Sequence, residues 1–139
     1  MTDSHKVYLG LGSNLGNKEE NILEAIKRIG EQIGVVVRQS SLYETEPWGF
    51  ESENHFVNAV VCCHTSLSPF DVLEHTQQIE RMLGRTSKTR HGEYHDRLID
   101  IDILLYDDMS IDSTSLKIPH PLMQERDFVM IPLREILND

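Results

Sequence analysis

The sequence DRLIDIDILLY at residues 96–106 predicts a strand that carries two carboxylates. Ile and Leu surround Asp100 and Asp102, and a run rich in β-branched residues favours a strand. Side chains two positions apart on a strand share one face, so both carboxylates point the same way. Two like charges among apolar neighbours are costly to hold together unless a cation offsets them. The stretch therefore predicts a Mg²⁺ site for phosphate chemistry, with Arg97 placed to contact the phosphates.

The same stretch also admits a simpler interpretation. Asp100 and Asp102 would then lie on an edge strand that has one solvated face, and both side chains would simply face water. Asp-x-Asp is too short a motif to separate the two interpretations, so the rest of the chain has to decide.

Hydrophobic spacing and turn residues predict an alternating order of strands and helices around this segment. Strands are predicted at residues 6–11, 35–43, 56–65 and 100–106, and helices from the Asn17 cap to Gly34 and from Ser68-Pro69 to Gly84. The order β-α-β-β-α-β is that of an α+β, ferredoxin-like fold with an antiparallel sheet. We expect the helices to cover one face and leave the other for ligands. A short C-terminal extension, with a helix beginning near Pro132, completes the expected fold.

Length and charge limit the class of protein. At 139 residues the chain fits one domain, residues 1–139, with a substantial core. Its net charge of −10 argues against nucleic acid as a partner. Five basic residues nevertheless cluster in one short region: Arg81, Arg85, Lys88, Arg90 and Arg97. This local cluster favours a small polyanionic ligand.

The N-terminal sequence and the arrangement of the cysteines indicate a cytoplasmic protein. No apolar run is long enough to span a bilayer, and the N-terminal MTDSHK lacks the apolar region of a signal peptide. Cys62 and Cys63 are adjacent, so on a strand they point to opposite faces and do not bridge each other. The seven histidines show no zinc-ligand spacing, and no zinc site is predicted.

Five segments, in order, resemble one enzyme family. They are GSNLG, SLYETEPWG with FVNAV after it, HTQQIERMLGR, RLIDIDILLY and IPHPLMQERDFV, within residues 8–133. The chain is similar to 6-hydroxymethyl-7,8-dihydropterin pyrophosphokinase. The resemblance implies an enzyme of folate biosynthesis that transfers pyrophosphate from ATP to the hydroxymethyl group of a dihydropterin, giving AMP and the pterin diphosphate. It also implies a monomer that binds small molecules and neither nucleic acid nor membrane.

The resemblance assigns roles to particular residues. Asp100 and Asp102 correspond to the aspartates that bind two Mg²⁺ ions with ATP, and Arg97 joins them as catalytic. The pterin-binding positions are Thr45, Glu46, Pro47, Trp48, Phe56, Asn58 and Phe128. The ATP-binding positions are Gln77, Glu80, Arg85, Arg97, His120 and Arg126. Aromatic rings would stack on the pterin, an amide would pair with its edge, and guanidinium groups would contact phosphate.

Two sets of these residues have simpler interpretations. Phe56 and Phe128 would be ordinary core aromatics. Gln77 and Glu80, at i and i+3, would form a solvated helix edge. The chain also departs from the family pattern at residues 90–97, RHGEYHDR, where relatives often carry Arg-Trp-Gly-Pro-Arg. This stretch is two residues longer, and Tyr94 or His95 stands in place of the Trp.

Two other functions fit the same fold. A regulatory module would bind a small ligand without Mg²⁺, with Asp-x-Asp merely solvated. A nucleotidyl transferase would use the paired aspartates to hold metals for a different acceptor. Pterin-dependent consumption of ATP distinguishes the pyrophosphokinase from both.

Overall fold

The computed structural model describes residues 4–45, 55–83 and 98–137. Its elements, in chain order, are β1 (His5–Ser13), α1 (Lys18–Gln32), β2 (Val35–Gln39), β3 (Tyr43–Thr45), β4 (Phe56–Thr65), α2 (Pro69–Met82), β5 (Asp100–Tyr106), β6 (Ile111–Asp112), β7 (Lys117–Ile118), the 3-10 helix η1 (Met123–Glu125) and α3 (Asp127–Leu137). The predicted order β-α-β-β-α-β is present, with one strand divided in two.

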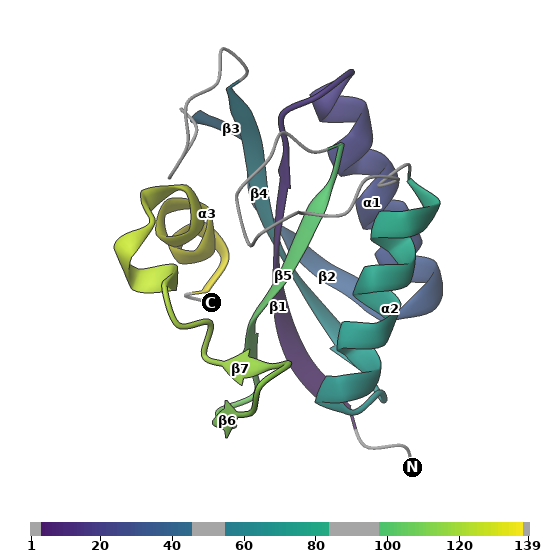
Figure 1. The fold of residues 1–139 in the computed structure, drawn as a ribbon, viewed down its shortest axis with the longest axis vertical. Helices are drawn as coiled ribbons and strands as arrows, with labels where there is room; N and C mark the ends of the chain where they lie inside the picture. Colours follow the sequence, from purple (N-terminus) through teal and green to yellow (C-terminus); the bar gives the residue numbers. More distant parts are fainter. Residues whose placement is uncertain (1–3, 46–54, 84–97, 138–139) are drawn as a thin grey trace.

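The main sheet is antiparallel and has the strand order β2-β4-β1-β5, while β3 also pairs with β4 (Figure 1). Strands β6 and β7 form a separate two-stranded ribbon. The long strands β1 and β4 lie at the centre, and β5, which carries the aspartates, pairs with β1. In the described part of the chain β5 is therefore an edge strand.

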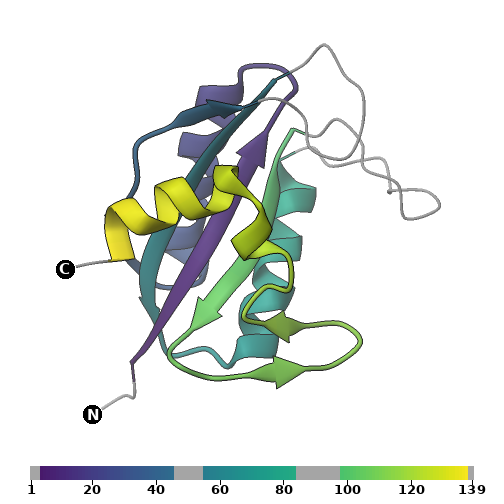
Figure 2. The same cartoon turned by 90° about the vertical axis from the view of Figure 1, so that its left-hand side faces the viewer.

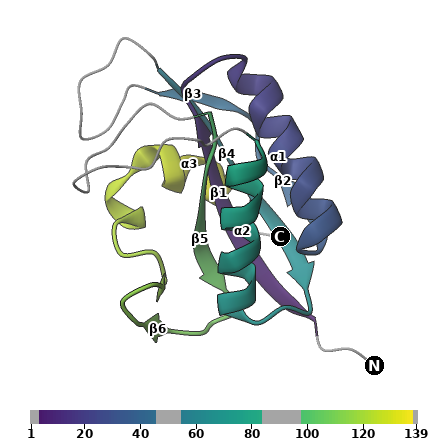
Figure 3. The same ribbon diagram turned by 45° about the vertical axis from the view of Figure 1, so that its right-hand side comes forward.

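Helices α1 and α2 cover one face of this sheet (Figure 3). The alternating side chains of the strands explain the position of the main core. Apolar residues at every second position, such as Leu9 on β1 and Val61 on β4, pack against Ile29 of α1 and Ile79 of α2. All four of these side chains are fully buried. The predicted helical layer is confirmed.

Helix α3 lies against part of the opposite face, where the sequence had predicted only space for ligands (Figure 2). The helix begins at Asp127, five residues before the predicted start, and contains Pro132. Proline lacks the N–H that would bond back to residue 128, and it therefore suggests a helix start. Val129 and Leu133 are buried against this face, and their packing makes the helix begin before the position that Pro132 suggests.

The predicted strand at residues 35–43 is two strands, both paired with β4. The break falls at Ser40, whose Oγ accepts a hydrogen bond from the Val60 N–H at 2.9 Å. The Ser40 N–H donates in turn to the Val60 carbonyl at 2.8 Å. A side chain thus replaces part of the regular pairing, and such local competition is typical of serine.

Both predicted helix starts are confirmed. Asn17 Oδ1 accepts a hydrogen bond from the Glu20 N–H at 3.2 Å, and Ser68 Oγ accepts one from the Asp71 N–H at 3.2 Å. Cys62 and Cys63 are unbridged and belong to opposite faces of the sheet, as expected. Burial raises the pKa of the Cys63 thiol to about 12, so this thiol stays protonated. Among the described residues, no helix is both long and apolar enough to cross a membrane.

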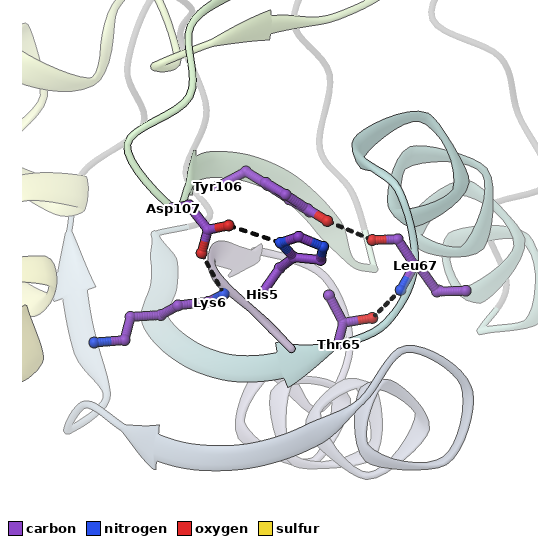
Figure 4. Close-up of polar contacts among 6 residues, drawn as sticks. All are labelled: His5, Lys6, Thr65, Leu67, Tyr106 and Asp107. Carbon is purple, nitrogen blue, oxygen red and sulfur yellow. Dashed lines mark hydrogen bonds and ion pairs between the residues drawn. The ribbon is translucent and has the colours of Figure 1, made fainter. Parts of the chain in front are cut away.

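A polar network joins the start of β1 to the end of β5 (Figure 4). Asp107 accepts hydrogen bonds from the Lys6 N–H at 2.7 Å and from His5 Nδ1 at 2.8 Å. The Tyr106 hydroxyl donates to the Leu67 carbonyl at 2.6 Å. Burial favours the neutral form of Asp107, but these donors outweigh it and hold the pKa of its carboxyl below the ordinary value of 3.8.

We expect Asp107→Asn to lower the free energy of unfolding at neutral pH and to have little effect on it at pH 2. A carboxyl whose pKa is lowered by folding contributes stability above its unfolded pKa and loses it as pH falls through the folded value. The loss at pH 7 should be about 1 kcal/mol or less, because this pair is partly solvated. Asparagine also tolerates the positive φ of 50° found at this position. Urea unfolding at pH 7 and at pH 2 checks this, and an equal loss at both values would contradict it.

Candidate functional site

A cavity of about 600 Å³, counted with the space it shares with solvent, lies between the sheet and α3. Four structural elements contribute most of its walls, namely β1, β4, β5 and the start of α3. The described residues that line it are Gly10, Leu11, Gly12, Thr45, Phe56, Asn58, Ala59, Val60, Asp100, Asp102, Arg126, Phe128 and Val129.

The paired carboxylates face this cavity from β5. Asp100 and Asp102 are half-buried, while Ile101 between them is buried in the opposite core. The prediction that both carboxylates share one face is therefore confirmed. The strand does lie at the sheet edge, as the simpler interpretation supposed, but the two side chains line a cavity.

Two glycines that the sequence analysis did not select form the cavity floor. On β1, Gly10 pairs with Asp102 and Gly12 pairs with Asp100. A Cβ at Gly10 would lie 3.4 Å from the Leu104 side chain, and a Cβ at Gly12 would lie 3.0 Å from Asn58 Oδ1, so side chains here would narrow the cavity. The signal in the sequence was the GLG spacing, which places two residues without side chains on one strand face.

The aromatic and amide residues lie on the other side of Gly12. Gly12 pairs with Asn58 of β4, as it pairs with Asp100 of β5. Asn58 and Asp100 are thus two strand spacings apart, about 10 Å. Asn58 Nδ2 donates to Thr45 Oγ1 at 2.7 Å, which fixes the orientation of the amide. The cavity therefore has an amide end and a carboxylate end within reach of one small ligand pair.

Phe56 and Phe128 are only partly buried, and both line the cavity. Phe128 also packs against the buried residues between the sheet and α3, so the core interpretation holds in part for this ring, while both rings present a surface to the cavity. Phe56 comes from β4 and Phe128 from α3, on either side of the space. The guanidinium carbon of Arg126 lies 5.6 Å from the centre of the Phe128 ring. Arg126 itself is only 6% exposed, so its charge lies within the cavity wall.

His120 lies near the carboxylate end, after β7. Its backbone N–H donates to the Leu104 carbonyl at 3.1 Å, which ties this turn to β5. Burial and the charge of Arg126 lower the pKa of His120, against the opposing effect of Asp100. The imidazole is therefore coupled electrostatically to both charged groups.

Gln77 and Glu80 of α2 lie on the other side of the sheet from the cavity. Gln77 is exposed, whereas Glu80 is only 3% exposed. Glu80 Oε2 accepts a hydrogen bond from the Ile101 N–H at 2.7 Å. The interpretation of both residues as a solvated helix edge is wrong for Glu80, because its carboxylate is buried against β5.

The residues present fit a divalent cation. Carboxylate oxygens are preferred ligands of Mg²⁺, which usually takes one or two from the protein and the rest from phosphate and water. Asp100 and Asp102 supply such a pair beside open space. Within the described segments, no group of three or more His, Cys, Asp and Glu side chains could hold a metal ion. Ligands from a phosphate and from water would therefore have to complete the shell.

Comparison with known proteins identifies the family. Residues 8–138 match the sequence model of the family described as 7,8-dihydro-6-hydroxymethylpterin-pyrophosphokinase. This chain belongs to that family. A relative from Porphyromonas gingivalis named 2-amino-4-hydroxy-6-hydroxymethyldihydropteridine pyrophosphokinase is 50% identical over 131 residues, covering 94% of this chain and 89% of that protein. A relative of the same name from Bacillus subtilis is 45% identical over 130 residues, covering 93% and 76%.

Solved structures confirm the ferredoxin-like fold for this member of the pyrophosphokinase family. A Plasmodium falciparum HPPK-DHPS triple mutant matches 98% of the chain with a TM-score of 0.74 and 16% identity. The wild-type HPPK-DHPS of the same organism matches 96% with a TM-score of 0.73. This chain spans about two fifths of the length of those chains.

Five residues that the pyrophosphokinase resemblance assigns to the site lie outside the described residues. They are Glu46, Pro47, Trp48, Arg85 and Arg97. Tyr94 and His95, in the stretch that departs from the family pattern, also lie outside. The other assigned residues divide into two groups. Asp100, Asp102, Thr45, Phe56, Asn58, Arg126 and Phe128 line one cavity. Gln77, Glu80 and His120 are not among its lining residues.

Proposed function

We propose that this chain transfers pyrophosphate from ATP to the hydroxymethyl group of 6-hydroxymethyl-7,8-dihydropterin, giving AMP and the pterin diphosphate in folate biosynthesis. Membership of the pyrophosphokinase family supports the reaction. The observation that carries the proposal for this chain is the shared cavity. One end presents paired carboxylates, and the other end presents two aromatic rings and an oriented amide.

We assign the pterin to the end of the cavity at Asn58. Phe56 and Phe128 would stack on the two faces of the flat heterocycle. Thr45 takes one amide proton of Asn58, so the second amide proton and the carbonyl oxygen remain to pair with the pterin edge. Glu46, Pro47 and Trp48 would complete this end by the family resemblance.

We assign the triphosphate to the carboxylate end. Asp100 and Asp102 would hold two Mg²⁺ ions together with ATP. Bound there, these ions would offset phosphate charge and keep the attacking and leaving oxygens in line. Arg126 lines this cavity, and the resemblance also assigns His120, Arg85, Arg97 and Gln77 to ATP.

The reaction requires only that the two ligands be held in line. The hydroxymethyl oxygen attacks the β-phosphorus and loses its proton, the bond from that phosphorus to the oxygen it shares with the α-phosphate breaks, and AMP leaves. The distance of about 10 Å between Asn58 and Asp100 allows the pterin alcohol to approach the phosphates. The proposal includes a monomer in the cytoplasm as one domain over residues 1–139.

The test measures AMP formed from ATP and the hydroxymethyl dihydropterin with excess Mg²⁺. AMP should appear only when the pterin and Mg²⁺ are both present. Absence of AMP with the wild-type chain would overturn the proposal. Pterin binding that is independent of Mg²⁺, without turnover, would indicate the regulatory module. Release of pyrophosphate in place of AMP would indicate a nucleotidyl transferase.

The cavity floor gives a selective prediction for the pterin. A Cβ at Gly12 would lie 3.0 Å from Asn58 Oδ1 and 3.4 Å from Phe56 Cδ1. Gly12→Ala should therefore disturb both pterin partners and raise the KM for the pterin by about tenfold or more, corresponding to a loss of about 1.4 kcal/mol or more. The KM for ATP should change much less. Steady-state kinetics with each substrate varied in turn measures both.

Gly30→Ala is the matched control for this substitution. A Cβ at Gly30, on α1, would meet no atom within 4 Å. The control should leave both KM values unchanged and raise helix stability by about 0.5–1 kcal/mol. An equal effect of Gly12→Ala on both KM values would contradict the assignment of this end of the cavity to the pterin.

A further inference from the structure

Glu80 is an acidic side chain buried at an unusual place. It is 3% exposed, on the face of α2 that packs against the main core. Burial of a carboxylate is costly unless strong donors satisfy it. One of its donors is the N–H of Ile101, at 2.7 Å from Oε2. Ile101 is the residue between Asp100 and Asp102, so Glu80 binds the backbone of the paired-aspartate motif.

The position of Ile101 explains why this hydrogen bond matters. In a strand, the N–H groups of successive residues point to opposite sides. The Ile101 N–H points to the side of β5 away from β1, where no strand pairs with it among the described residues. Glu80 supplies the acceptor that a neighbouring strand would otherwise provide. The bond fixes the peptide plane between Asp100 and Ile101, and so restrains the strand backbone from which the two aspartate side chains project.

We propose that Glu80 is a positioning residue that holds Asp100 and Asp102 in register for metal and triphosphate binding. It acts through the Ile101 backbone from the core side of the sheet, whereas the family resemblance implies a direct contact with ATP. The described lining of the cavity includes no residue of α2, which supports the indirect role. This inference rests on the proposed function only for its effect on catalysis.

Three substitutions separate the geometry of Glu80 from its charge. Glu80→Gln keeps the length and an acceptor oxygen but removes the charge. Glu80→Asp keeps the charge, but it is one methylene shorter and cannot reach Ile101 in the same geometry. Glu80→Ala removes both. A positioning role predicts that Glu80→Gln retains more activity than Glu80→Asp. Direct binding of a cation by the carboxylate predicts the reverse order.

The first measurement uses metal-free protein and does not depend on activity. Amide hydrogen exchange at Ile101 should be about tenfold faster or more in Glu80→Asp and Glu80→Ala, and close to wild type in Glu80→Gln. Unchanged exchange in Glu80→Asp and Glu80→Ala would overturn the proposed anchor. This result stands whether or not the chain makes AMP, so failure of the anchor and failure of the proposed function are distinguishable.

The second measurement is the Mg²⁺ dependence of AMP formation. The Asp and Ala variants should need about tenfold more Mg²⁺ or show about tenfold lower kcat, as is usual when a partner that orients metal ligands is lost. Glu80→Gln should stay within about threefold of wild type by the same reasoning. The opposite outcome is an equal loss of activity in Glu80→Gln and Glu80→Asp, together with a raised KM for ATP and normal Ile101 exchange in Glu80→Gln. That result would show that the carboxylate charge contacts the ligands, and it would overturn the proposal.

Thr76→Ala is the matched control for general damage to α2. Thr76 is 1% exposed on the same helix, and its hydroxyl donates within the helix to the Leu73 carbonyl at 2.8 Å. Its loss should lower stability without changing Ile101 exchange relative to its neighbours or the Mg²⁺ dependence. If Thr76→Ala reproduced both effects of Glu80→Asp, destabilisation of α2 would explain them and the anchor would be rejected.

Discussion

Replacing Asp100 or Asp102 with alanine is expected to lower kcat by about three orders of magnitude, corresponding to about 4 kcal/mol of transition-state stabilisation. The two carboxylates share one face of β5 and line the same cavity. Each substitution removes one carboxylate ligand for the Mg²⁺ ions that would bind the triphosphate. Among the described residues, no other pair of carboxylates lines the cavity, so no other side chains can take over when one aspartate is lost.

The folded state should survive these substitutions. Both side chains are half-buried and carry like charge, so removal of one relieves repulsion. Thermal unfolding should therefore give an unchanged or slightly higher Tm. Asp108→Ala is the matched control, since Asp108 is exposed just beyond the same strand and should keep full activity. A large fall in Tm, with normal activity in the remaining folded protein, would make the pair structural and refute the metal assignment.

Replacing Gly34 with alanine is expected to destabilise the protein by about 3 kcal/mol or more. A Cβ at this position would lie 2.0 Å from the carbonyl oxygen of His64 and 3.0 Å from Thr65 Cα. Both are backbone atoms of β4, the strand at the centre of the sheet, and they cannot rotate away. Relief would require a shift of α1 relative to β4.

Urea unfolding measures this loss as a lower midpoint with an unchanged slope. Gly30→Ala, four residues earlier, is the control, because open space surrounds its Cβ position. A destabilisation of Gly34→Ala below about 1 kcal/mol would mean that the strand adjusts at little cost. Kinetic constants of the folded variant should stay near wild type, because Gly34 lies outside the cavity lining.

The sequence predicted Gly34 for a different reason. A glycine at the end of a helical pattern indicates a left-handed cap. The helix does end nearby, at Gln32, but among the described glycines only Gly16 has positive φ. Gly34 is required because a backbone from a distant part of the chain passes close to it. Contacts of that kind leave no mark in local sequence spacing.

Long-range contacts also explain where the structure of the candidate site differs from the sequence predictions. The Asp-x-Asp spacing was sufficient to place both carboxylates on one face, and that prediction is confirmed. The position of α3 was not predictable from Pro132, because burial on the second face of the sheet outweighs the local preference of proline. Glu80, similarly, reads as a solvated helix residue until β5 is placed beside it.

The sequence by itself determined the order of strands and helices, the two helix starts, the face shared by the aspartates and the family to which the chain belongs. Each of these depends on short-range periodicity, on capping, or on motifs in order along the chain. Only the tertiary structure decided that Gly10 and Gly12 pair with the aspartates, that α3 covers part of the second face, and that Glu80 holds the Ile101 peptide. Those features depend on which strands pair and in which register, and register is set by packing of the whole sheet.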